Sequence, residues 1–143
     1  MSKPNLKFWK NKKVLVTGHT GFKGGWLSVL LNQMRSKVFG YALNPQGKNN
    51  FFNIAKVKSI LSADYRNDIT NYKDLKKIIK KNKPEIIFHL AAQSSVIESF
   101  KDSHHTISTN ILGTANLLES IKNFNFVKSL VIITTDKVYQ NYK

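Results

Sequence analysis

Apolar runs alternate along the chain with stretches in which apolar residues recur at helical spacing. The first run, residues 13–17, is β-rich and ends at a glycine. The stretch 24–35 follows and predicts an amphipathic helix after a glycine turn. We expect its apolar side chains in the core: Trp26, Leu27, Leu30, Leu31 and Met34.

A second strand and a weaker third strand are predicted next. Residues 38–43 form an apolar run closed by Asn44-Pro45, a turn signal that forbids helix continuation. A short helix is predicted at 51–56. The third strand, at 60–65, leads to Asp68.

The remaining pattern repeats helix and strand twice more. A lysine-rich helix is predicted over 70–83, and the apolar run at 85–92 is typical of a strand buried on both faces of a parallel sheet. A long helix predicted over 94–123 and a fifth strand predicted at 129–134 complete the pattern. This alternation predicts a doubly wound, Rossmann-like α/β fold with five parallel strands in the order 3-2-1-4-5.

The glycines at the first strand–helix junction carry the strongest functional signal. Gly18, Gly21 and Gly24 have the spacing Gly-x-x-Gly-x-x-Gly. The first allows a tight turn, the second lets a pyrophosphate approach the backbone, and the third allows close helix packing. A helix N-terminus also favours an anion. The strand before and the helix after favour a dinucleotide site over a plain glycine loop.

The end of the second strand is where an acidic residue commonly binds the ribose of NAD. Asn44 occupies this position. It can hydrogen-bond a hydroxyl but neither repels nor attracts a 2′-phosphate as a charged residue would, and Lys48 slightly favours NADP. Asp68 has two interpretations, an adenine contact and an Asx turn or N-cap.

Composition narrows the class of protein. With 41% hydrophobic residues, the 143 residues suit one domain, and the chain has no cysteine for a disulfide or a thiolate metal site. No apolar run reaches the roughly 18 residues that cross a bilayer. The basic N-terminus lacks the apolar segment of a signal peptide. We expect a cytoplasmic protein without a membrane partner.

The net charge of +15, from 23 basic and 8 acidic residues, would suit a nucleic-acid partner. However, Arg35 and Arg66 are the only arginines, whereas base and phosphate recognition favours arginine. Nucleic-acid binding is therefore not the favoured function. The adjacent His104 and His105 diverge on a helix and predict no metal site, and His89 is expected to be a satisfied core histidine.

Five strings, in order along nearly the whole chain, resemble the CDP-glucose 4,6-dehydratases of the extended short-chain dehydrogenase/reductase family. They are VLVTGHTGFKG at 14–24, GYALNP at 40–45, FHLAAQ at 88–93, NILGT at 110–114 and TTDKVY at 134–139. His19-Thr20 and the sequence Thr-Asp-Lys favour this branch, since most nucleotide-sugar 4,6-dehydratases carry Thr-Asp-Glu there. Asn44 departs from the aspartate that is usual in the branch.

The resemblance implies a redox-neutral dehydration of CDP-glucose in which NAD takes hydride from sugar C4, water leaves across C5 and C6, and hydride returns to C6. It implies that Thr135 hydrogen-bonds near the C4 hydroxyl, Asp136 is the general acid at C6, and Lys137 takes the place of the base at C5. Three serines have two open interpretations, substrate positioning as the resemblance implies and helix capping: Ser94, Ser95 and Ser99. The implied cofactor contacts are Gly18, Thr20, Gly21, Phe22, Gly24, Asn44, Asp68, Leu90, Ala91 and Ala92.

The family also uses a Tyr-x-x-x-Lys pair on a later helix. The literal match at Tyr139 and Lys143 directly follows Thr-Asp-Lys, and we interpret it as coincidental. We therefore expect residues 1–143 to be an incomplete NAD-binding domain, inactive alone, whose partner is a second copy or a missing C-terminal half. The alternatives are a stand-alone dinucleotide-binding module and a different nucleotide-sugar epimerase or dehydratase.

Overall fold

The computed structural model describes residues 5–135. Five parallel strands form one sheet in the order β3-β2-β1-β4-β5, which confirms the predicted topology. The strands are β1 (Lys13–Thr17), β2 (Lys37–Ala42), β3 (Ala63–Arg66), β4 (Ile86–His89) and β5 (Ser129–Ile132).

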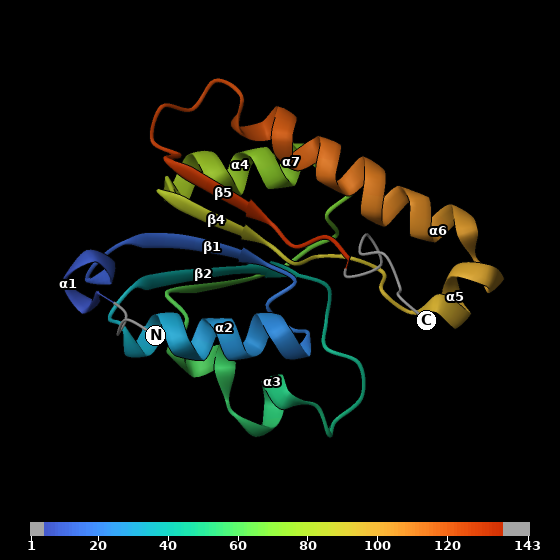
Figure 1. Cartoon of the computed structure of the whole chain (residues 1–143), viewed down its shortest axis with the longest axis horizontal. Coiled ribbons are helices and arrows are strands. Elements are labelled where there is room, and N and C mark those ends of the chain that lie inside the picture. Colours follow the sequence, from blue (N-terminus) through green and yellow to red (C-terminus); the bar gives the residue numbers. More distant parts are fainter. Residues whose placement is uncertain (1–4, 136–143) are drawn as a thin grey trace, which may run out of the picture.

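Helices cover both faces of the sheet, so the predicted doubly wound α/β class is confirmed. Figure 1 shows α2 and α3 on one face, and α4 and α7 on the other. The helices are α1 (Leu6–Trp9), α2 (Phe22–Gln33), α3 (Phe51–Ile54), the 3-10 helix η1 (Val57–Ile60), α4 (Tyr72–Asn82), α5 (Val96–Lys101), α6 (Ser103–Ile107), the π-helix η2 (Ser108–Leu112) and α7 (Gly113–Ile121). Within the described part of the chain, none of these helices is long and apolar enough to span a membrane.

The core has two halves, one on each face of the sheet, because successive side chains of a strand point to opposite faces. In β1, Leu15 packs toward α4 and α7, whereas Val14 and Val16 pack toward α2. All three are at most 1% exposed. The central strand is therefore buried on both sides.

The position of α4 follows from its end signals. The Asn71 side chain accepts a hydrogen bond from the Asp74 backbone N–H and starts the helix. Lys83 ends it in the left-handed conformation, with its N–H donating to the Ile79 carbonyl at 2.9 Å. Pro84 follows, and its ring prevents continuation.

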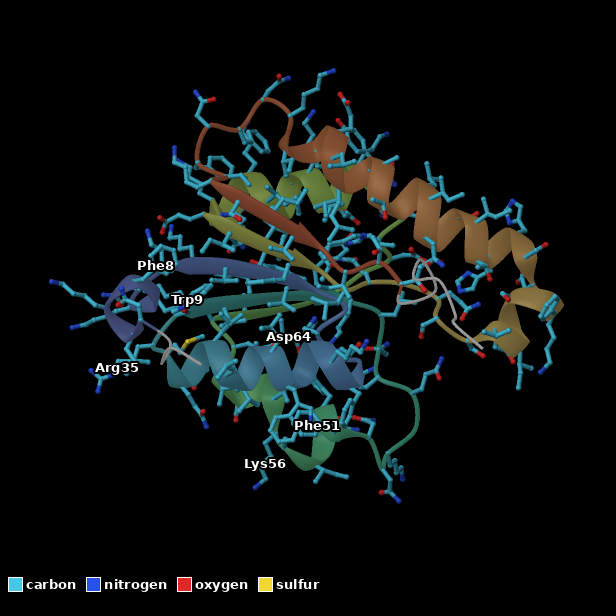
Figure 2. The ribbon with its side chains drawn as sticks, viewed as in Figure 1. Phe8, Trp9, Arg35, Phe51, Lys56 and Asp64 are labelled. Atoms are coloured by element: carbon cyan, nitrogen blue, oxygen red, sulfur yellow. The ribbon has the colours of Figure 1, made fainter. Side chains whose placement is uncertain are left out.

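The expected apolar face of α2 is wrong in part. The buried positions are Gly24, Gly25, Ser28 and Leu31, whereas Trp26 is 53% exposed. The small residues bring the helix close to its neighbours, and the Ser28 hydroxyl is satisfied by the Gly24 carbonyl at 2.7 Å. Trp26 instead stacks on Phe51 of α3, with ring centroids 4.5 Å apart. Figure 2 shows Phe51 between α2 and α3. Leu30 is exposed as well.

The helix expected over residues 94–123 is also wrong as a single element. Asp102 breaks it, because its backbone is not helical, at φ −138° and ψ 79°, and its carboxylate accepts from the His105 N–H as the N-cap of α6. A π-helical turn then separates α6 from α7. The sequence pattern also missed the short helices α1 and η1.

Candidate dinucleotide-binding site

A cleft of about 1010 Å³ lies at the carboxyl ends of the strands, where open α/β sheets bind ligands. Its walls come from the turn after β1 and from the segments that follow β2, β3, β4 and β5. Every residue predicted to contact the cofactor lines this cleft: Gly18, Thr20, Gly21, Phe22, Gly24, Asn44, Asp68, Leu90, Ala91 and Ala92.

The three glycines of the turn have different structural roles. Gly18 has φ +73°, and a Cβ there would lie 2.7 Å from backbone atoms of Leu90 and Ala91. A Cβ on Gly24 would lie 2.2 Å from the Gly18 carbonyl oxygen. Gly21 has space, since its Cβ would meet that oxygen at 3.4 Å. The first and third glycines are therefore required by the fold, and Gly21 is the one that the turn itself does not need.

The N-terminus of α2 opens into the cleft with its positive end unopposed. Gly21 is its N-cap and supplies no side-chain cap, and the first turn carries no acidic residue. Phe22, at the first helical position, lines the cleft with its side chain 69% exposed. Backbone N–H groups at such a terminus can bind a phosphate.

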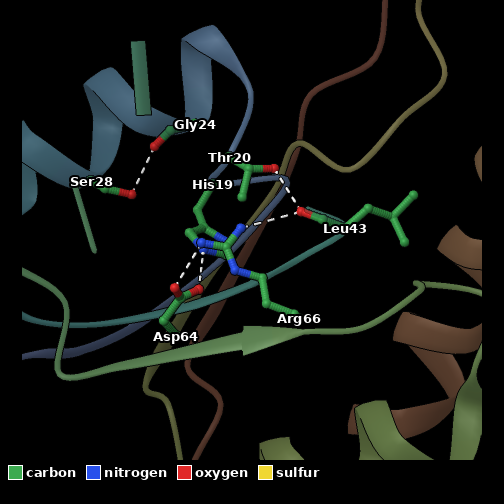
Figure 3. Close-up of polar contacts among 7 residues, drawn as sticks. All are labelled: His19, Thr20, Gly24, Ser28, Leu43, Asp64 and Arg66. Carbon is green, nitrogen blue, oxygen red and sulfur yellow. Dashed lines mark hydrogen bonds and ion pairs between the residues drawn. The ribbon is translucent and has the colours of Figure 1, made fainter. Parts of the chain in front are cut away.

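The end of β2 is held to the glycine turn. The Thr20 hydroxyl donates to the Leu43 carbonyl at 3.1 Å, and the Arg66 guanidinium donates to the same oxygen at 3.3 Å (Figure 3). Asn44 is the next residue, and it is exposed in the cleft wall. These contacts hold the end of β2, and with it Asn44, close to the glycine turn.

A buried polar network beneath the turn was missed by the sequence reasoning. His19 Nε2 lies 2.8 Å from Asp64 Oδ1, and Arg66 donates to Asp64 Oδ2 at 2.7 Å. Burial lowers the pKa of His19, while the Asp64 carboxylate opposes this shift. The His19 ring sits over Gly40, where a Cβ would lie 2.4 Å from it. Pairing of Gly40 with Asp64 in the parallel register brings these residues together.

A second hydrogen-bonded chain crosses from the turn to the helices above β4. The backbone N–H groups of Leu90 and Ala91 donate to the Thr17 hydroxyl oxygen at 3.2 Å each. That hydroxyl lies 2.7 Å from His89 Nδ1, and His89 Nε2 lies 3.1 Å from the Thr114 hydroxyl. Burial lowers the pKa of His89 to about 4, so the ring is neutral. His89 is the satisfied core histidine that the sequence predicts.

The loop after β4 is fixed by paired amides. Gln93 donates its backbone N–H to Asn110 Oδ1 at 2.8 Å, and Asn110 Nδ2 donates to the Gln93 carbonyl at 2.9 Å. Asn110 lies in η2, and π-helical turns are frequent at functional sites. Thr114 donates to the Asn110 carbonyl at 2.7 Å, which joins this pair to the His89 chain.

The Asx turn proposed for Asp68 is present. Its Oδ1 accepts from both the backbone N–H and the hydroxyl of Thr70, each at 2.8 Å. Asp68 still lines the cleft, so its contact with adenine stays a prediction.

The serine and threonine predictions have mixed outcomes. Ser95 caps α5 by accepting from the Glu98 N–H, and both Ser94 and Ser95 line the cleft. Ser99 donates to the Val96 carbonyl within the same helix at 2.7 Å. Thr134 lines the cleft and Thr135 follows it with an exposed side chain. The remaining residues of interest lie outside the described range: Asp136, Lys137, Tyr139 and Lys143.

The described residues 5–135 contain no group of three or more histidine, cysteine or acidic side chains that could hold a metal ion. Asp68, which lines the cleft, accepts its hydrogen bonds from Thr70 in its own turn. A doubly wound sheet with a glycine turn opening into a cleft at its carboxyl edge defines the class of dinucleotide-binding α/β domains.

The chain belongs to the GDP-mannose 4,6 dehydratase family, whose model matches residues 15–142. It is 43% identical over 134 residues to the CDP-glucose 4,6-dehydratase of Salmonella typhimurium, covering 94% of this chain and 37% of that protein. It is 35% identical over 130 residues to the dTDP-D-glucose 4,6-dehydratase of Dictyostelium discoideum, covering 90% and 30%. The resemblance to CDP-glucose 4,6-dehydratases is therefore confirmed.

A solved structure shows a similar fold. UDP-glucose-4-epimerase from Stenotrophomonas maltophila, with bound NAD and formylated UDP-arabinopyranose, has a TM-score of 0.78 and 25% identity, covering 92% of this chain and 39% of that chain. The chain thus spans well under half the length of these relatives.

Proposed function

We propose that the cleft binds NAD and that the chain is the NAD-binding portion of a nucleotide-sugar 4,6-dehydratase that converts CDP-glucose to its 4-keto-6-deoxy product. The observation that carries the first part is the gathering of all ten predicted cofactor residues around one cleft. The second part is supported by the family membership and by the 43% identity to a CDP-glucose 4,6-dehydratase.

The described residues suit the parts of a dinucleotide. The space at Gly21 and the N–H groups at the start of α2 would hold the pyrophosphate. Asn44 would hydrogen-bond the adenosine ribose, and Asp68 would accept from the adenine amino group. Leu90, Ala91 and Ala92 would bound the other end of the cofactor, since they line the cleft after β4.

Bound NAD supplies a hydride acceptor and donor, which lets a dehydration proceed without net oxidation. Around it, the chain would position sugar and protons. Thr135 would hydrogen-bond near the C4 hydroxyl, Asp136 would protonate the departing C6 hydroxyl, and Lys137 would act on the C5 proton. These roles are carried over from the family to matching positions. Ser94 and Ser95, on the cleft wall, would contact the substrate.

A different nucleotide-sugar reaction is the second candidate. It is favoured by the likeness of the fold to UDP-glucose-4-epimerase at a TM-score of 0.78. The higher identity to the dehydratase of Salmonella typhimurium favours dehydration.

Titration calorimetry with NAD tests the binding proposal. The unmodified chain should bind NAD, and Gly21→Leu should abolish binding because its side chain would fill the pyrophosphate position. Gly21→Ala is the graded control, since a single Cβ has room in the turn. A Gly21→Leu variant that remains folded by circular dichroism and binds NAD as tightly as the unmodified chain would contradict the proposal.

A further inference from the structure

An arginine lies beside the strand end that would hold the adenosine ribose. Arg66 is the last residue of β3 and pairs with Ala42, the last residue of β2. Its guanidinium donates to the Leu43 carbonyl at 3.3 Å, one residue before Asn44. Its Cζ also lies 4.5 Å from the centroid of the Phe52 ring. Two contacts therefore hold the charge beside Leu43, which lines the cleft.

Asp64 engages the remaining side of this guanidinium. The guanidinium donates to Asp64 Oδ2 at 2.7 Å (Figure 3). The Asp64 side chain is only 10% exposed. A carboxylate held this close and this far from water interacts with its partner more strongly than a surface pair does. The Arg66 side chain itself is 25% exposed, and it contacts Leu43, which lines the cleft.

We propose that Asp64 makes Arg66 a specificity-determining residue: by pairing with the guanidinium, Asp64 withholds it from the 2′-phosphate of NADP, and the cleft selects NAD. This inference rests on the proposed dinucleotide binding and adds the residues that discriminate between the two cofactors.

The need for such a pair follows from the charges near the ribose position. Asn44 is neutral and cannot repel a phosphate, while the chain carries a net charge of +15 that attracts one. An unpaired arginine at this strand end would bind a 2′-phosphate through charge-assisted hydrogen bonds. Selection against NADP would then require a group that neutralises the arginine.

His19 keeps the Asp64 charge directed at Arg66. It binds the other carboxylate oxygen at 2.8 Å, and its own side chain is fully buried. Burial lowers the His19 pKa and the Asp64 carboxylate opposes this shift, so the two side chains are coupled. Gly40 leaves the space that this ring occupies. The glycine turn therefore carries a residue that fixes the carboxylate next to the arginine.

The test is the ratio of the dissociation constants for NADP and NAD, measured by calorimetry on the full chain. Asp64→Asn should lower this ratio roughly tenfold, because the amide keeps the shape of the carboxylate but frees the Arg66 charge. The double variant with Arg66→Gln should restore the ratio of the unmodified chain. Glu85→Gln is the matched control. It removes one negative charge just before β4, at the amino ends of the strands, whereas the cleft lies at their carboxyl ends.

Asp64→Ser replaces Asp64→Asn should the latter not fold, and it carries the same expectation. A folded Asp64 variant whose ratio stays within twofold of the unmodified chain would overturn the inference, as would a gain that persists in the Arg66→Gln background. The two proposals fail differently. An unmodified chain that binds neither NAD nor NADP refutes the dinucleotide site and this inference with it. A chain that binds NAD but shows no change of ratio refutes the role of Asp64 alone.

Discussion

His89 gives the fold a stability that depends on pH. Its ring is 2% exposed and lies between the hydroxyls of Thr17 and Thr114. Burial lowers its pKa from 6.5 to about 4, because a charged imidazole would lose its hydration there. The unfolded chain therefore takes up a proton on this histidine as the pH falls through about 6.5, whereas the folded chain does so only near pH 4.

The direction and size of the effect follow from this difference. Between about pH 6.5 and 4 the unfolded state binds more protons, so the free energy of unfolding decreases as the pH falls. At 1.36 kcal/mol per pH unit, the interval from 6.5 to about 4 corresponds to about 3 kcal/mol. Above about pH 7.5 the histidine is neutral in both states and contributes no pH dependence.

Urea unfolding of the unmodified chain and of His89→Asn at about pH 7.5 and about pH 4.5 measures this contribution. The asparagine does not titrate, so the stability difference between the two proteins should shrink by about 2.5 kcal/mol at the lower pH. His104→Asn, at an exposed position on α6, is the control and should parallel the unmodified chain. If the difference in the free energy of unfolding between His89→Asn and the unmodified chain is the same at both pH values, the His89 pKa is not lowered by folding.

Two further predictions concern the cleft. Gly24→Ala should lower the free energy of unfolding by about 3 kcal/mol or more, because its Cβ would lie 2.2 Å from the Gly18 carbonyl oxygen; Gly21→Ala, with 3.4 Å of space, should cost less than about 1 kcal/mol. Thermal melts of the two variants check this, and equal losses would contradict it. Asn44→Asp should widen the preference for NAD over NADP roughly tenfold in calorimetry, because a carboxylate repels a 2′-phosphate; an unchanged preference would place the ribose elsewhere.

The strands could be predicted because each has a local apolar run, and their order could be predicted from the alternation of strands and helices. Residues 85–92 are apolar at nearly every position, which only a strand buried on both faces requires. The glycine spacing at 18–24 fixes the first crossover and with it the cleft edge. The ten residues predicted to contact the cofactor gather around one cleft for the same reason, since each lies in the turn or in a segment that follows a strand.

The features that the sequence did not predict depend on contacts between residues that no local pattern encodes. Asp64 and His19 are 45 residues apart and meet only through the register of β2 with β3. The break at Asp102 was hidden because apolar residues continue on both sides of it, while its capping bond to His105 decides the outcome. Trp26 was assigned to the core by its hydrophobicity, but the small residues of α2 are the ones that face the sheet.

Nuclear magnetic resonance of the backbone amides during titration with NAD tests whether the cleft is a dinucleotide site. We expect the largest shifts on the residues around the cleft, namely the turn at 18–24, Asn44, Asp68 and the segment 90–92. They should be absent in Gly21→Leu at the same NAD concentration. If the unmodified chain shows no shifts, or if the shifts cluster on the lysine-rich face of α4, the cleft is not the NAD-binding site.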